Sequence, residues 1–228
     1  MQLILVNKKT EVENVESFLF QADENISWKA GQFMRYVIND PKPDERRIYR
    51  FFTIAAAPFE KHLMVTTRFV PGDGSTFKKD LLNLRVGDSI EATGPSGDFV
   101  IEDPEQSYVF IAGGIGITPF RSIILDLHQK GLPVNITLLY ANRTADFIFK
   151  PELESVQKRH PELKIEYFVD PARIDEEVIR RQLSANSNAI FYISGPEPMV
   201  EAFEAMVYKL GVPKEMVKRD YFPGYTGL

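Results

Sequence analysis

The chain has 228 residues, 44% hydrophobic and 26% charged, which is enough for two globular domains that each bury a core. A net charge of −5 and the absence of any long apolar run argue against nucleic-acid binding and against a membrane span. With no cysteine, disulfides, thiol nucleophiles and cysteine-held metal clusters are excluded, and the three histidines show no metal-ligand spacing. No metal site is therefore expected.

The first hundred residues contain short apolar or alternating runs, separated by turns rich in Gly and Pro. The N-terminal run is followed by lysines, an order that suits a first strand and not a signal peptide, so a cytoplasmic protein is expected. Strands are predicted at 3–6, 17–21, 32–38, 50–55, 62–69 and 89–93. Their spacing indicates a small antiparallel β-barrel. One helix is predicted at 75–82, where Ser75 suits the N-cap.

Beyond residue 104 the pattern changes to alternating strands and helices. Strands are predicted at 108–112, 134–140, 164–169 and 189–193. One helix has apolar residues from Phe120 to Leu127 and ends near Gly131, and a last helix has them from Met199 to Leu210. This alternation predicts a parallel sheet with helices on both sides. We therefore expect an antiparallel β-barrel domain at 1–103 and a Rossmann-like α/β domain at 104–228.

Two glycine-rich loops are candidate phosphate sites. The turn Gly113–Pro119 follows a strand and opens a helix, where glycines allow close approach of a pyrophosphate and the helix dipole favours an anion. It matches only part of the GxGxxG pattern, because Pro119 replaces the third glycine, and a plain tight turn is the alternative. Residues 72–76 form a second loop before a helix, for which a simple N-cap is the alternative.

Five motifs together span nearly the whole chain: Arg50-Phe-Phe52-Thr53, Gly72-x-x-Ser75, Gly94-Pro-x-Gly97-x-Phe99, Gly113-Gly-x-Gly-x-Thr118-Pro119 and Ser194-Gly195-Pro196-x-x-Met199. In their sequence, order and separations they resemble motifs of the ferredoxin–NADP reductase superfamily. In one respect the sequence departs from the family, since Ser194 stands where most members have Cys.

The resemblance implies that the first domain binds FAD. Arg50 would pair with the flavin pyrophosphate, Phe52 would pack along the flavin or its ribityl chain, and Thr53 would offer a hydroxyl near the flavin N5 edge. Further members of the phosphate cradle would be Arg68, Gly74, Ser75 and Thr76. Without the family pattern, Arg50 would be interpreted as a surface ion pair and Phe52 as a core residue.

The same resemblance implies a nicotinamide site in the second domain. Its pyrophosphate would lie on Gly113, Gly114 and Gly116, and Thr118 would lie near the nicotinamide. The opposite wall would be formed by Ser194, Gly195, Pro196 and Met199.

The aromatic C-terminus also has a counterpart in the family, whose terminal segment often places an aromatic ring against the flavin. Phe222 or Tyr225 could do so here; alternatively, Phe222 only ends a final strand. The residues expected to act in the reaction are Thr53, Thr118, Ser194 and Phe222.

The reaction implied is hydride transfer from a nicotinamide coenzyme to FAD, followed by electron transfer to a separate acceptor. A ferredoxin, a flavodoxin or a membrane redox subunit could accept the electrons. One alternative is a free-flavin or ferric reductase, and another is a non-catalytic flavin-binding redox subunit or sensor. No Gly-x-Ser-x-Gly elbow is present, which excludes the common hydrolase pattern.

NADH is expected as the coenzyme, although NADPH is possible. Asp170-Pro171 follows the strand at 164–169, at a place where NADP-dependent members tend to have a Ser-Arg pair. A carboxylate accepts hydrogen bonds from a ribose diol and repels a 2′-phosphate. Arg143 and Arg173 argue the other way, and Asp170 could be a simple turn residue before proline.

Overall fold

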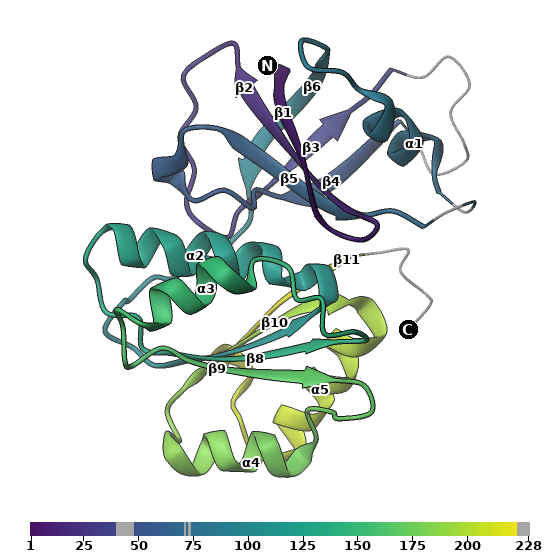
Figure 1. Ribbon diagram of the computed structural model, residues 1–228. Helices are drawn as coiled ribbons and strands as arrows, with labels where there is room; N and C mark the ends of the chain where they lie inside the picture. Colours follow the sequence, from purple (N-terminus) through teal and green to yellow (C-terminus); the bar gives the residue numbers. More distant parts are fainter. Residues whose placement is uncertain (40–47, 71, 73, 223–228) are drawn as a thin grey trace. The chain divides into compact units, whose positions relative to one another are not determined.

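The structure is a computed structural model that describes residues 1–39, 48–70, 72 and 74–222. Its strands and helices form two compact units, Met1–Val100 and Ile101–Leu228 (Figure 1). Among the helices of these described ranges, none is long and apolar enough to cross a membrane.

The first unit is a curled antiparallel sheet of six strands. They are β1 (Gln2–Val12), β2 (Val15–Ala22), β3 (Phe33–Val37), β4 (Tyr49–Thr53), β5 (Leu63–Arg68) and β6 (Ser89–Ser96), in the order β4-β3-β6-β1-β2-β5. The two edge strands, β4 and β5, come close to each other where β4 ends. There the Ala55 N–H donates to the Met64 carbonyl of β5 at 2.8 Å. The predicted antiparallel barrel-type fold is thus confirmed, in the form of a half-barrel.

Local signals explain most of this unit. Leu3 and Leu5 of β1 are fully buried, while the residues between and beside them are exposed, as the period of a half-buried strand requires. The strand continues to Val12 through polar residues because it pairs with β2 as far as Val15. A short 3-10 turn (Pro58–Glu60) precedes β5, and α1 (Thr76–Asn83) begins after Ser75, whose Oγ accepts the Lys78 N–H at 3.3 Å. The predicted helix and its N-cap are confirmed.

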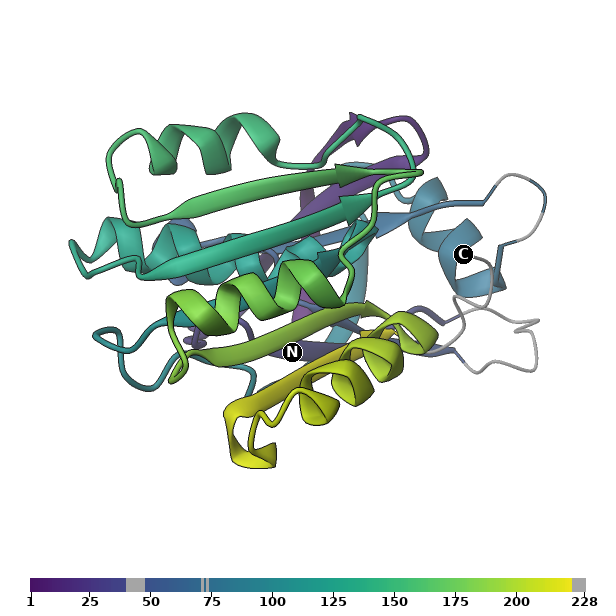
Figure 2. The ribbon, with the colours of Figure 1, turned by 90° about the horizontal axis from the view of Figure 1, so that it is seen from below.

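The second unit is a five-stranded parallel sheet in the order β11-β10-β7-β8-β9. Its strands are β7 (Tyr108–Gly113), β8 (Ile136–Asn142), β9 (Lys164–Val169), β10 (Ile190–Pro196) and β11 (Val217–Phe222). Helices α2 (Ile117–Gln129) and α3 (Lys150–Gln157) cover one face, and α4 (Glu176–Ala185) and α5 (Glu197–Lys209) cover the other (Figures 1 and 2). Two 3-10 turns, Gly114–Gly116 and Lys214–Met216, complete the unit. The predicted α/β fold is confirmed.

Both faces of this sheet are packed. Every residue of β7 is buried, as expected for the central strand of a parallel sheet. On one face Phe110 stacks on Phe120 of α2, with ring centroids 4.4 Å apart. On the other, strand residues pack with apolar residues from α4, α5 and their flanks: Val109, Ile111, Phe191, Ile193, Ile174, Ile179, Val200 and Val207.

Strand β11 lies at the edge, parallel to β10, with Phe222 opposite Pro196. Phe222 therefore ends a strand, as the structural alternative for this residue stated. Tyr225 lies outside the described residues.

Two of the three histidines, distant in sequence, are hydrogen-bonded to each other. His128 Nδ1 lies 2.8 Å from His160 Nε2, and His160 Nδ1 lies 3.0 Å from Glu162 Oε1. Glu162 also accepts the Val134 N–H, and Arg159 Nη1 lies 3.5 Å from His128 Nε2. Burial, followed by the charges of His160 and Arg159, lowers the pKa of His128.

This pKa shift predicts acid sensitivity. Since the unfolded chain binds a proton at His128 more readily than the folded chain, stability should be complete above the ordinary histidine pKa of about 6.5 and decline as the pH falls below it. In His128→Gln, urea unfolding at pH 7.5 and pH 5.0 should show a smaller difference in the free energy of unfolding than in the wild type. His62→Gln, in the first unit, is the matched control. An unaltered pH dependence in His128→Gln would contradict the assignment.

Candidate cofactor-binding site

The predicted nicotinamide-side residues gather at one edge of the second unit. In a parallel sheet all carboxyl ends lie at the same edge, which is where α/β proteins bind ligands. Gly113 ends β7 and pairs with Ala141, while Pro196 ends β10 and pairs with Phe222. Asp170 follows β9 at this edge, and its N–H donates to the Asn142 carbonyl at 3.3 Å. The glycine turn, Asp170 and residues 194–199 are therefore brought together.

Three glycines at this edge lie close to residues of β10 and α5. A Cβ on Gly113 would lie 2.2 Å from Met199 Sδ, and one on Gly116 would lie 2.2 Å from the Ser194 carbonyl oxygen. At Gly195 a Cβ would lie 2.5 Å from Met199 Cε. The backbone of Ser194 cannot move aside for a methyl group, so the turn can lie on β10 only because Gly116 has no side chain. At Gly113 and Gly195 the atom in the way is the flexible end of Met199, which could shift.

Gly114 differs from its neighbours because it faces open space. Its φ of +52° lies in the left-handed region, and among described atoms only Asn142 Oδ1, at 3.9 Å, would be near a Cβ there. Its carbonyl accepts hydrogen bonds from the Ile117 N–H and, at 3.1 Å, from the Tyr140 hydroxyl. Of the turn glycines, Gly114 is the one that a ligand can approach.

Two hydroxyls at this edge are buried. Thr118, 3% exposed, donates to the Ile115 carbonyl at 3.2 Å, so its hydroxyl is directed into the turn itself. Ser194 is fully buried, and its Oγ has no hydrogen-bond partner among the residues that the structure describes. An unsatisfied buried hydroxyl costs about 1–3 kcal/mol, which a water or a ligand group would recover. The open Gly114 and the Ser194 hydroxyl, unpartnered among the described residues, therefore fit a nicotinamide coenzyme, which carries a pyrophosphate and polar groups.

Asp170 is exposed and lies in a tight turn, in which the Ala172 N–H donates to the Val169 carbonyl at 2.8 Å. The turn role that we considered for Asp170 is thus present. Its carboxyl group nevertheless lies at the same edge as the glycine turn. Arg143 and Arg173 are exposed in the segments that follow β8 and β9.

In the first unit, Arg50 and Phe52 lie on the inner face of β4 beside an aromatic cluster. Arg50 Cζ is 5.5 Å from the Phe77 ring centroid, and its Nη1 donates to the Tyr49 carbonyl at 2.7 Å. The Phe52 ring lies 5.9 Å from both Tyr36 and Phe77. Phe52 thus makes core contacts and stays half-buried, while Thr53 is buried. Burial raises the pKa of the Tyr36 phenol above its usual range, so this neighbour of Arg50 remains uncharged.

Positive charge is concentrated near the start of α1. Lys78 Nζ donates to the Arg68 carbonyl at 2.7 Å, which fixes the end of β5 to the helix. The first turn of α1 carries no acidic residue, and its N–H groups favour an anion. Around this turn lie Ser75, which is buried, Thr76, which is half-buried, and Gly74, where a Cβ would meet only ordinary contacts. These residues and Arg50 fit a pyrophosphate.

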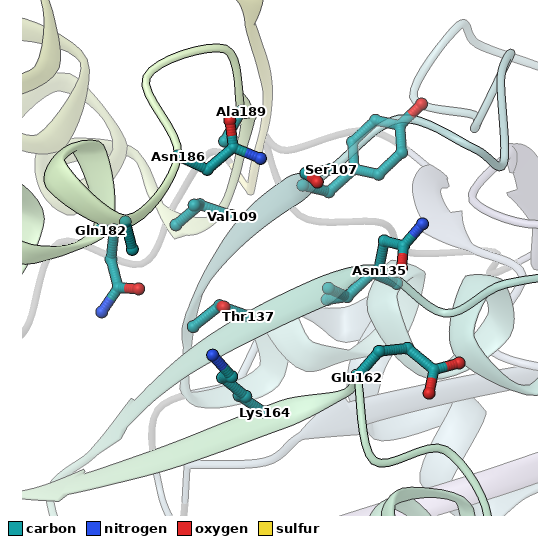
Figure 3. Close-up of a pocket in the computed structure, with 12 residues that line it drawn as sticks. Ser107, Val109, Asn135, Thr137, Glu162, Lys164, Gln182, Asn186 and Ala189 are labelled. Carbon is teal, nitrogen blue, oxygen red and sulfur yellow. The ribbon is translucent and has the colours of Figure 1, made fainter.

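A hollow of about 220 Å³ lies at the opposite, amino-terminal edge of the parallel sheet (Figure 3). Two of its polar side chains are engaged in hydrogen bonds, since Asn135 donates to the Glu105 carbonyl and Gln182 donates to Glu166. None of the predicted site residues lines it. It is therefore distinct from the candidate site at the carboxyl-terminal edge.

The chain is similar to proteins described as oxidoreductases and reductases. Residues 110–205 match the model of the oxidoreductase NAD-binding domain family. A flavohemoprotein from Halalkalibacterium halodurans is 25% identical over 96% of the chain, and the glycine betaine monooxygenase reductase subunit from Chromohalobacter salexigens is 30% identical over 68% of it. The chain spans 59% and 42% of the lengths of these relatives.

The fold has a close structural counterpart. The cytochrome b5 reductase domain of Ulva prolifera nitrate reductase is 26% identical to the chain, with a TM-score of 0.82 and 96% of each chain covered. The similarity therefore includes both units.

The packing of the glycine turn predicts unequal costs for two Gly→Ala changes. Gly116→Ala should lower the free energy of unfolding by about 3 kcal/mol or more, since the new methyl group collides with the backbone of Ser194. Gly131→Ala is the control: its φ is +64°, but nothing lies within 4 Å, so strain alone should cost about 1–2 kcal/mol. Urea unfolding of both variants measures the difference, and equal losses would show that the close approach is not a constraint.

Proposed function

We propose that the chain is a member of the ferredoxin–NADP reductase superfamily, a reductase that oxidises a nicotinamide coenzyme, reduces FAD and passes the electrons to a separate acceptor. One observation carries this proposal: each unit has its own set of groups suited to a pyrophosphate. In the second unit these are the open Gly114 and the first turn of α2, and in the first unit they are Arg50 and the first turn of α1.

The first unit would hold FAD. Arg50 would make a charge-assisted contact with the pyrophosphate, supported by Arg68 and the α1 turn (Gly74, Ser75 and Thr76). Phe52 would pack against the flavin with the face that Tyr36 and Phe77 leave uncovered, and the Thr53 hydroxyl would hydrogen-bond near N5. Bound FAD would supply the conversion between two-electron and one-electron transfer.

The second unit would hold the coenzyme. Gly114 would contact the pyrophosphate, while Gly113 and Gly116 would keep the turn in place by close packing. Thr118 and Ser194 would lie by the nicotinamide, and the buried Ser194 Oγ would gain a partner there. Gly195, Pro196 and Met199 would shape the opposite wall.

A separate acceptor is supported by the reductase subunit among the relatives. A ferredoxin, a flavodoxin and a membrane redox subunit all suit one-electron release. Steady-state assays with ferredoxin, flavodoxin, free FMN and a ferric complex separate this function from that of a free-flavin or ferric reductase. Stopped-flow mixing with NADH separates both from a redox sensor, whose flavin would stay oxidised.

Arg50→Ala should weaken FAD binding roughly 10- to 100-fold, because a hydrogen bond to a charged group contributes about 1.5–3 kcal/mol. Arg50→Lys should recover only part of the affinity, since an ammonium group lacks the bidentate geometry. The measurement is the flavin content of the purified protein and calorimetric titration of the apoprotein. Arg35→Ala is the matched control, because Arg35 lies on the other face of the same sheet, over Tyr49. Full FAD retention in Arg50→Ala would contradict the assignment.

NADH should reduce the flavin faster than NADPH, because the Asp170 carboxylate repels a 2′-phosphate. Asp170→Ser should narrow the ratio of the two rates in stopped-flow mixing. Glu201→Gln removes the same charge from an exposed site on α5 and should leave the ratio unchanged. If NADPH worked equally well in the wild type, the preference would be wrong; if the ratio were the same in Asp170→Ser, another residue would set it.

A further inference from the structure

We propose that Tyr140 is a positioning residue of the coenzyme site, whose hydroxyl fixes the glycine turn at Gly114 before the ligand binds. The identity of the ligand as a nicotinamide coenzyme rests on the function proposed above. The tether itself rests on the hydrogen bond from the Tyr140 hydroxyl to the Gly114 carbonyl.

The turn is anchored in different ways along its length. Gly113 is held by contact with Met199, and Gly116 is held against the backbone of Ser194 and Gly195. Gly114 lies between these anchors, in a left-handed conformation and beside open space. Its carbonyl accepts the Ile117 N–H from within the turn and the Tyr140 hydroxyl from β8. Of these two bonds, only the second connects Gly114 to the sheet.

Tyr140 is a rigid support. It is fully buried in β8, opposite Ala112 of β7. Its ring packs edge-on against Phe147, with centroids 4.8 Å apart, and lies 6.2 Å from the Tyr167 ring. Because these aromatic neighbours hold the ring, the hydroxyl stays 3.1 Å from the Gly114 carbonyl oxygen.

A rigid glycine turn should increase the affinity for an anion that is bound by backbone N–H groups. A turn that is ordered in advance loses little conformational entropy when the ligand arrives, whereas a loose turn loses more and binds more weakly. The entropy loss on ordering is largest for a glycine such as Gly114, because glycine has the widest choice of backbone conformations. A phenylalanine at position 140 would fill the same space and leave the turn without its tether.

The test is Tyr140→Phe in the full-length, FAD-loaded protein. Stopped-flow reduction at varied NADH should show the coenzyme Kd rising roughly 3- to 10-fold, as expected when the backbone of about one residue must be ordered on binding. The limiting rate of flavin reduction should change by less than about twofold, because the groups around the nicotinamide are untouched. Amide hydrogen exchange at residues 114–116 should accelerate in the absence of coenzyme.

Tyr108→Phe is the matched control. The Tyr108 hydroxyl also donates to a backbone carbonyl, that of Asp103, at 2.7 Å, but at the other edge of the same sheet. It should cost similar stability and leave both coenzyme affinity and exchange at 114–116 unchanged. Equal effects of the two variants on affinity and exchange would overturn the proposal, since Tyr140 would then be only structural.

Titration with inorganic pyrophosphate, followed by the amide NMR signals of residues 114–116, tests the tether without flavin chemistry. Weaker pyrophosphate binding in Tyr140→Phe would support the positioning role even if neither NADH nor NADPH reduced the flavin, an outcome that would remove only the proposed function. A wild-type turn that binds neither pyrophosphate nor coenzyme would overturn the Tyr140 assignment.

Discussion

The second unit depends on the close contact between the glycine turn and the end of β10. Because Gly116 has no side chain, the turn can lie directly on the backbone of Ser194 and Gly195. Neighbouring strands β7 and β10 can therefore each continue into a helix at the same edge, with α2 on one face of the sheet and α5 on the other. The first turns of both helices lie at this edge, where their N–H groups favour a negatively charged ligand. Gly116 thus allows the candidate site to form by close packing, although Gly114 is the glycine that a ligand can approach.

The first unit meets the same electrostatic requirement by other means. Its candidate phosphate site adds long cationic side chains to the first turn of α1, and Arg50 among them is supported by aromatic rings. A cation acts over several ångströms and tolerates small displacements, whereas backbone N–H groups must be at hydrogen-bond distance. The candidate site of the first unit therefore relies partly on cations, whereas that of the second unit relies on backbone groups held by close packing.

Local signals account for what the sequence could predict. The strand at 164–169 and the Ser75-capped helix were predicted closely, because a short apolar run and an N-cap are properties of neighbouring residues. A similar signal before α4 was overlooked: Asp175 caps that helix by accepting the Val178 N–H at 3.0 Å. Strand β11 is rich in charge and pairs with β10 at the edge of the sheet, so its strand character comes from pairing more than from composition. The gathering of residues from four segments at one edge followed from parallel topology. The burial of Ser194 and the bond from Thr118 to Ile115 depend on packing that no local pattern encodes.

The position of β11 has a practical consequence. The strand delivers the chain to Phe222, opposite Pro196 at the coenzyme edge, and six further residues follow in the sequence. Six residues reach at most about 20 Å. Anything joined after Leu228, whether a purification tag, a fluorophore or a further domain, is consequently tethered within that radius of the edge. A fluorophore there would be well placed to report binding at the proposed coenzyme site, and a bulky fusion would hinder access to it.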